Sequence, residues 1–192
     1  WSDLDGNNYQ GSIVNDVIEG GDGFDSFSGR EGNDVILAGA GGDWVEANSG
    51  NDFADGGANG TSSNSWENRD RFRLSGDQKR YDITEIGQSE FDTFIASNFD
   101  VSNSVVAGLA FDASKTYFLI TDKSPFGKTD TNPYGGDGQD LITGFERIEF
   151  GDVGLSLVYE VNWYAQDWSN TAELGIRGTS FADTINASDE IL

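Results

Sequence analysis

The chain has 192 residues, of which 34 are acidic and 11 are basic, so its formal net charge at pH 7 is -23. Such an acidic surface argues against nucleic acids and anionic membranes as partners, because basic surfaces bind both. The sequence has no cysteine and no histidine, which excludes disulfide bonds and removes the usual ligands of zinc, haem and iron–sulfur sites.

A nine-residue repeat fills residues 11–55. An aspartate recurs at every ninth position, and an apolar residue follows two positions after each. The aspartates are Asp16, Asp25, Asp34, Asp43 and Asp52, and the apolar residues are Ile18, Phe27, Ile36, Val45 and Ala54. With glycines at most fourth positions, the stretch follows the calcium-binding template Gly-Gly-x-Gly-x-Asp-x-U-x, in which U is apolar. The alternative is a solvated loop or a disordered linker, which five strictly phased repeats disfavour.

The period predicts how the repeats stack. Glycine permits tight turns, aspartate supplies a hard anionic oxygen, and each x-U-x triplet is a short strand with its central side chain pointing inward. Two turns and two strands make one coil, so equivalent turns lie eighteen residues apart. We therefore expect one edge to be lined by Asp16, Asp34 and Asp52, and the other by Asp25 and Asp43. We expect Ile18, Ile36 and Ala54 to face Tyr9, Phe27 and Val45 across a thin core.

This repeat stretch resembles the RTX repeats of proteins that bacteria export by type I secretion. The resemblance implies a parallel β-roll with calcium ions between successive turns, held by carboxylates and main-chain carbonyls. The residues expected to hold calcium are Asp16, Gly20, Asp22, Gly23, Asp25, Gly29, Gly32, Asp34, Gly41, Asp43, Gly50 and Asp52. Because so thin a core cannot hold itself together, we expect several calcium ions to supply much of the folding free energy.

Residues 61–177 differ in character, since glycine becomes rarer and aromatic and β-branched residues alternate with polar ones. Short strands are predicted at residues 71–76, 80–86, 91–97, 116–122, 145–152 and 155–161. This pattern favours a β-sandwich whose strands cap the roll, and a short helix is predicted near Asn170. The sequence thus predicts an all-β chain. It comprises an RTX β-roll at residues 1–60, a β-sandwich-like ligand-binding domain at 61–177, and the start of a second repeat segment at 178–192, with Asp183 in the metal position.

A further copy of the template stands alone at residues 135–143, GGDGQDLIT, with Asp140 in the metal position. No repeat lies eighteen residues away, so a calcium ion here is expected to take other ligands from Asp130, Asp137 or water. A cation that keeps waters can exchange them for a ligand's carboxylate or hydroxyls. The alternative is a glycine-rich hairpin with a solvated aspartate. Residues 69–152 as a whole resemble the β-rich segment that follows RTX repeats in large secreted bacterial proteins.

Four aromatic residues crowd together at residues 158–168 and are candidates for ligand binding: Tyr159, Trp163, Tyr164 and Trp168. Tyrosine and tryptophan supply rigid contact area at recognition sites. The alternative is that they belong to a core, and strand alternation would expose at most half of them.

These features predict a calcium-dependent extracellular module of a bacterial RTX adhesin, secreted or held at the cell surface. We expect a monomer, joined to neighbouring domains of a longer chain, that binds a peptide or glycan ligand on another surface with help from an incompletely caged calcium ion or an aromatic cleft. The alternative is a passive secretion and folding module of a type I-secreted enzyme. We expect no enzyme within these residues, because general bases are most often histidines and no G-x-S-x-G motif is present. A carboxylate pair of the glycosidase kind is left open.

Overall fold

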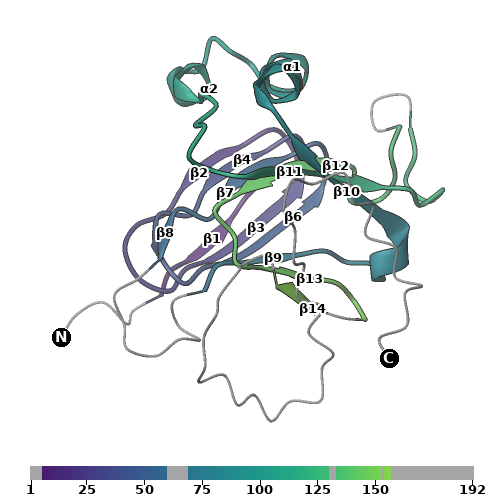
Figure 1. The fold of residues 1–192 in the computed structure, drawn as a ribbon, viewed down its shortest axis with the longest axis horizontal. Coiled ribbons are helices and arrows are strands. Elements are labelled where there is room, and N and C mark those ends of the chain that lie inside the picture. The colour runs from purple at the N-terminus through teal and green to yellow at the C-terminus, as the bar shows by residue number, and fades with distance from the viewer. Residues whose placement is uncertain (1–5, 60–68, 130–132, 153, 157–192) are drawn as a thin grey trace.

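The computed structural model describes residues 6–59, 69–129, 133–152 and 154–156. Two sheets of six strands face each other across a common core (Figure 1). The first sheet runs in the order β1 (Asn8–Gln10), β3 (Ser26–Glu31), β6 (Trp44–Ser49), β9 (Arg71–Arg73), β13 (Arg147–Glu149) and β14 (Gly154–Ser156). The second runs β10 (Tyr81–Ile86), β11 (Tyr117–Asp122), β12 (Gln139–Thr143), β7 (Phe53–Asp55), β4 (Val35–Leu37) and β2 (Val17–Glu19). A small parallel pair joins β5 (Ala40–Gly41) to β8 (Ala58–Asn59).

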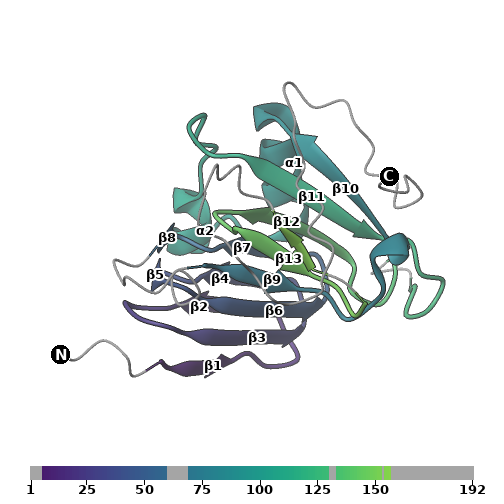
Figure 2. The ribbon, with the colours of Figure 1, turned by 60° about the horizontal axis from the view of Figure 1, so that its bottom comes forward.

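The repeats form a parallel β-roll, as the nine-residue period predicts. Strands β1, β3 and β6 lie side by side (Figure 2) and pair in parallel with partners eighteen residues apart. Phe27 therefore lies between Tyr9 and Val45. Strands β2, β4 and β7 repeat the same register, with Ile36 between Ile18 and Ala54. Both rows point into one core. The all-β class and the inward position of the U residues are therefore confirmed.

Both sheets continue without a break past residue 60. In the first sheet, Phe72 of β9 follows Val45, and Ile148 of β13 follows Phe72. In the second sheet, Ile142 of β12 follows Ala54. Among the described strands, the antiparallel pairs are β13 with β14, β12 with β11, and β11 with β10, and the other pairs are parallel. Strands β9 to β14 thus extend the two sheets of the roll rather than forming sheets of their own, because Phe72, Ile142 and Ile148 continue the same inward rows.

Two α-helices cover the outer face of the second sheet (Figure 1): α1 (Gln88–Asn98) and α2 (Ser104–Gly108). A short 3-10 helix, η1 (Gln78–Arg80), precedes β10. In α1, Phe91, Phe94 and Ile95 are buried against a second apolar cluster on that face. The prediction of a strand at residues 91–97 is wrong. Phe94 and Ile95 follow Phe91 by three and four positions, the spacing of an amphipathic helix, and the three residues pack onto apolar side chains on the outer face of the sheet.

The other predicted strands coincide with observed ones where the structure describes them. Residues 71–76, 80–86, 116–122 and 145–152 contain β9, β10, β11 and β13. Strand β14 lies at the start of the predicted strand at 155–161. The helix expected near Asn170 lies outside the described residues. No helix within the described ranges has the length and apolar character needed to span a membrane.

Candidate metal centre

A line of carboxylates runs along one edge of the roll, which we call the Asp16 edge. The main-chain N–H of each member donates to the Oδ1 atom of the member in the next coil. The N···Oδ1 distances are 2.8 Å from Asp16 to Asp34, 2.7 Å from Asp34 to Asp52 and 3.3 Å from Asp52 to Asp140. Three coils of this edge are therefore consecutive repeats, and the fourth comes from the distant segment that contains Asp140.

The opposite edge, which we call the Asp25 edge, has the same pattern. It consists of Asn7, Asp25, Asp43, Asp70 and Glu146. Each main-chain N–H donates to a side-chain oxygen of the next member, over distances of 2.8, 2.8, 2.7 and 2.7 Å in that order. Asp16, Asp25, Asp34, Asp43 and Asp52 thus take the edge positions that the repeat spacing predicts.

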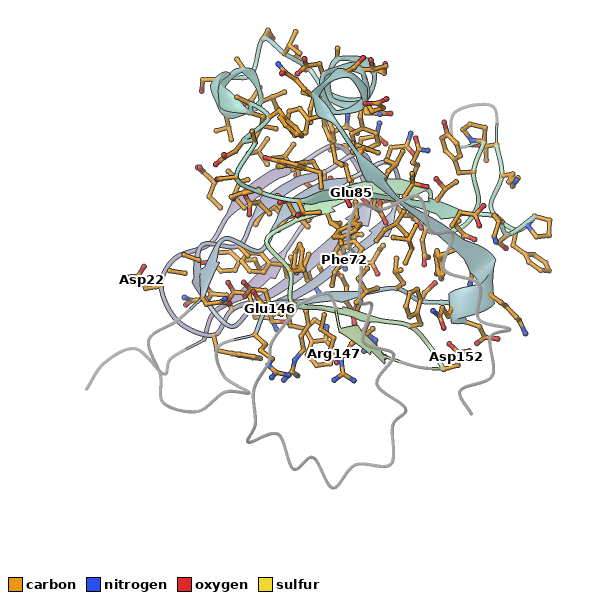
Figure 3. The ribbon with its side chains drawn as sticks, viewed as in Figure 1. Asp22, Phe72, Glu85, Glu146, Arg147 and Asp152 are labelled. Atoms are coloured by element: carbon orange, nitrogen blue, oxygen red, sulfur yellow. The ribbon has the colours of Figure 1, made fainter. Side chains whose placement is uncertain are left out.

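Asp70 and Glu146 are not found from the repeat spacing. Asp70 follows Asp43 by 27 residues, and Glu146 follows Asp70 by 76. The signal that could have found them is local, since each precedes a buried apolar residue, Phe72 or Ile148, by two positions. Figure 3 shows Phe72 inside the molecule and Glu146 nearer its boundary. In both cases an acidic residue takes an edge position because the apolar residue two positions later extends the row of inward side chains.

The second carboxylate oxygens of four edge residues are buried without a hydrogen-bond partner. They are the Oδ2 atoms of Asp34, Asp43, Asp52 and Asp70, and all four residues are fully buried. A buried carboxylate oxygen without a partner is costly, because it has lost water and gained nothing in exchange. Four such atoms along two edges indicate that a cation completes the structure.

The space beside these oxygens suits a calcium ion. A Cβ atom built on Gly29 would lie 2.5 Å from the Oδ2 of Asp34 and 2.6 Å from the carbonyl oxygen of Ala47 in the next coil. A carboxylate and a carbonyl therefore converge on a gap that only a glycine leaves open. Hard cations such as Ca²⁺ take mixed carboxylate and carbonyl oxygens at 2.3–2.6 Å. Among the described residues no group of three or more acidic side chains is placed to hold a metal, so main-chain carbonyls must complete each site.

The predicted glycine ligands shape the turns. Gly23, Gly32, Gly41 and Gly50 all have positive φ, and a Cβ on Gly41 would lie 1.7 Å from the Gly23 carbonyl oxygen. Gly20 likewise lies against the carbonyl of Ala38. The close stacking of successive turns therefore needs glycine in these places. Asp22 is exposed, pairs with Ala40 of the next coil and lies on neither edge.

Burial raises the pKa of the edge carboxyls. Loss of solvent raises the pKa of Asp34 and Asp43 to about 7 and that of Asp70 to about 8, although each accepts a main-chain hydrogen bond that opposes the change. Burial raises the pKa values of Asp52 and Asp140 well above the ordinary range, and neighbouring charges add to this effect, that of Asp34 at Asp52 and that of Asp52 at Asp140. Without a metal ion, these carboxyls are therefore easier to protonate in the folded chain than in the unfolded one.

This difference predicts opposite pH dependences with and without metal. In chelator, stability should be greatest near the unfolded pKa of 3.8 and should be lost as the pH rises through the folded values of about 7 to about 8, because the folded chain binds more protons than the unfolded chain. In calcium, stability should rise over the same window, since the ion needs ionised carboxylates. Melting curves between about pH 5 and pH 8 measure both trends.

The Asp34→Asn variant, with one buried titrating group fewer, is the matched control for this pH dependence. In chelator, its melting temperature should fall less steeply with rising pH than that of the parent. This difference isolates the effect of the buried Asp34 carboxyl from the general effect of a net charge of -23. A metal-free melting temperature that rises from about pH 5 to pH 8 would contradict the assignment.

The segment at residues 135–143 differs from its expected role. Asp140 is not isolated, because it joins the Asp16 edge beside Asp52, and both residues are buried. Asp137 accepts hydrogen bonds from the main chain and hydroxyl of Ser75 and from the hydroxyl of Tyr81, so protein groups surround its carboxylate. Asp130, Asp183 and the four candidate aromatics, Tyr159, Trp163, Tyr164 and Trp168, lie outside the described residues.

Comparison with known protein families agrees with this geometry. Residues 10–45 and 37–59 match the RTX calcium-binding nonapeptide repeat (4 copies). A comparison with curated proteins gave no match. The match covers the five phased aspartates, and RTX nonapeptide repeats bind Ca²⁺. Residues 10–59 are therefore a block of RTX calcium-binding nonapeptide repeats.

Proposed function

We propose that the chain is a calcium-folded structural module of a secreted RTX protein, in which calcium ions along the Asp16 and Asp25 edges hold successive coils together. The observation that carries this proposal is the row of buried Oδ2 atoms without partners on Asp34, Asp43, Asp52 and Asp70. Each buried charge destabilises the metal-free fold and becomes a ligand once calcium is present. The ion therefore contributes directly to the free energy of folding.

The same chemistry supports a role in export. Extracellular calcium modules bind the ion with dissociation constants of about 10⁻⁴–10⁻³ M, far above the calcium concentration inside a cell. A chain whose turns repel one another without calcium stays unfolded during export and folds outside. We propose this behaviour for the RTX repeats and for the strands that extend their sheets.

An adhesive role is expected to use an incompletely caged calcium at residues 135–143 or the aromatic residues at 158–168, which lie outside the described residues. The buried position of Asp140 and its contact with Asp52 favour a closed structural site there. The geometry therefore supports the folding role better than peptide or glycan capture by an open calcium ion. The absence of catalysis stays a prediction, which rests on the lack of histidine and cysteine.

A calcium titration of the purified chain tests the proposal. At about 37 °C and pH 8, above the lowered melting temperature of the metal-free chain, far-ultraviolet and near-ultraviolet circular dichroism should show little fixed structure in chelator. The same spectra should show a cooperative gain of β-structure with a midpoint of about 10⁻⁴–10⁻³ M calcium. Magnesium at the same concentration is the control and should be much weaker, because it demands a smaller octahedral cage. A native spectrum and an unchanged melting temperature in excess chelator would refute the proposal.

A further inference from the structure

The turn at residues 135–140 stacks on the turn at 47–52 as one repeat stacks on the next. Gly138 pairs in parallel with Gly50, and the main-chain N–H of Leu141 donates to the Asp52 carbonyl at 2.8 Å. The corresponding step inside the repeats, from Phe53 to the Asp34 carbonyl, is also 2.8 Å. Two segments that are 88 residues apart in the sequence therefore stack on each other as consecutive coils.

A row of side-chain amides beside the Asp16 edge follows the same path. The main-chain N–H of Asn33 donates to Asn15 Oδ1 at 2.9 Å, and that of Asn51 donates to Asn33 Oδ1 at 3.0 Å. Gln139 continues the row, with its main-chain N–H 3.0 Å from Asn51 Oδ1. Two independent hydrogen-bond rows thus place the turn at residues 135–140 in the register of a repeat.

Where these two turns meet, the carboxylates of Asp52 and Asp140 are buried and lack a cationic partner among the described residues. The Oδ2 atom of Asp52 has no hydrogen-bond partner, and Asp52 and Asp140 are 0% and 2% exposed. None of the ion pairs between described residues involves either of them. The guanidinium of Arg80, which lies near Gly136 of the same segment, is paired with Asp122. Two adjacent buried carboxylates without a basic partner require a bound cation or a shared proton.

The backbone at this step is as tightly stacked as inside the repeats. Gly138 has a φ of +84°, and a Cβ on it would lie 1.5 Å from the Gly50 carbonyl oxygen. Gly41 makes the equivalent approach to Gly23 within the repeats, at 1.7 Å. The two turns therefore approach each other as closely as two repeats do, and their main-chain carbonyls are the ligands that would join the two carboxylates around a calcium ion.

We propose that Asp52 and Asp140 share a calcium ion with main-chain carbonyls of the turns at 47–52 and 135–140. This site lies partly outside the residues that match the RTX repeat, 10–59, and it closes a loop of 88 residues. A link across so long a loop restricts the unfolded chain strongly, so it couples the folding of residues 69–129 to calcium. The inference rests on the proposed calcium-driven folding but adds a site of its own.

The number of calcium ions bound per chain tests this site. Isothermal calorimetry and native mass spectrometry should show that Asp140→Asn binds one calcium ion fewer than the parent, because asparagine keeps the Oδ1 acceptor but loses the charged ligand. Asp92→Asn, a change of the same chemistry on the exposed side of α1, should bind as many ions as the parent. An Asp140→Asn variant that binds as many ions as the parent would overturn the site.

A second measurement on the parent chain decides the matter if Asp140→Asn fails to fold. Crystals soaked in terbium, which shares calcium's preference for oxygen ligands, should give an anomalous peak between Asp52 and Asp140. Peaks beside Asp16 and Asp34 without one beside Asp140 would overturn the site and leave the proposed function intact. A chain that binds no ion at all would refute both.

Discussion

Replacing Asp34 by asparagine is expected to lower the melting temperature in calcium and to raise it in chelator at pH 8. Asp34 lies between Asp16 and Asp52 on the Asp16 edge, so its carboxylate borders two calcium sites, one toward each neighbouring coil. At a calcium concentration of about 100 times the dissociation constant, each filled site adds about 2.7 kcal/mol to the free energy of unfolding. Weakening two sites should therefore remove several kcal/mol of calcium-dependent stability.

The sign reverses in chelator because the same carboxylate is then a buried charge. Its pKa is raised to about 7 by burial, so at pH 8 the metal-free fold carries an ionised oxygen without a partner. Asparagine keeps the acceptor for the Asp16 N–H and removes that charge. Thermal melts of the parent, Asp34→Asn and the exposed control Asp92→Asn, each in calcium and in chelator, measure the effect. If Asp34→Asn melts like the parent in both conditions, the metal assignment of the Asp16 edge is wrong.

Truncating Phe72 to alanine is expected to destabilise the whole chain, including the repeats. Phe72 (Figure 3) lies outside the repeat match, yet it is fully buried between the sheets. It is in register with Val45 on one side and Ile148 on the other. Its ring also contacts Phe145, with the ring centroids 5.4 Å apart. Loss of a buried phenylalanine side chain costs about 3–5 kcal/mol, and for a chain of this size that corresponds to roughly 10 °C in melting temperature.

Phe126→Ala is the matched control, because Phe126 is 79% exposed and its truncation removes the same atoms without opening a cavity. Differential scanning calorimetry in saturating calcium should show one transition that shifts downward in Phe72→Ala and stays in place in Phe126→Ala. A calcium-dependent transition of the repeats that keeps its temperature in Phe72→Ala would show that the roll folds independently of residues 69–156.

The hydrogen-bonded coils at residues 11–55 could be predicted because their order in space follows their order in the chain. A nine-residue period sets an eighteen-residue coil, and that coil decides which aspartates share an edge and which apolar residues face inward. Asp34, for example, has its edge partners eighteen residues away on either side. The turns are rich in glycine and aspartate and the U residues point inward, so few other strand registers are open to this stretch. The sequence alone therefore determined the β-roll and its calcium-binding turns.

The tertiary structure alone decided what continues the roll. The steps from Asp43 to Asp70, from Asp70 to Glu146 and from Asp52 to Asp140 span 27, 76 and 88 residues, and no periodic pattern relates them. They are selected because Phe72, Ile148 and Ile142 complete the inward apolar rows. Burial of apolar side chains also determines helix α1, because residues 91–97 are helical where Phe91 and Ile95 pack on the apolar outer face of the second sheet. Local spacing determines a structure only while neighbours in space are neighbours in the chain, and beyond residue 59 burial of apolar surface takes over.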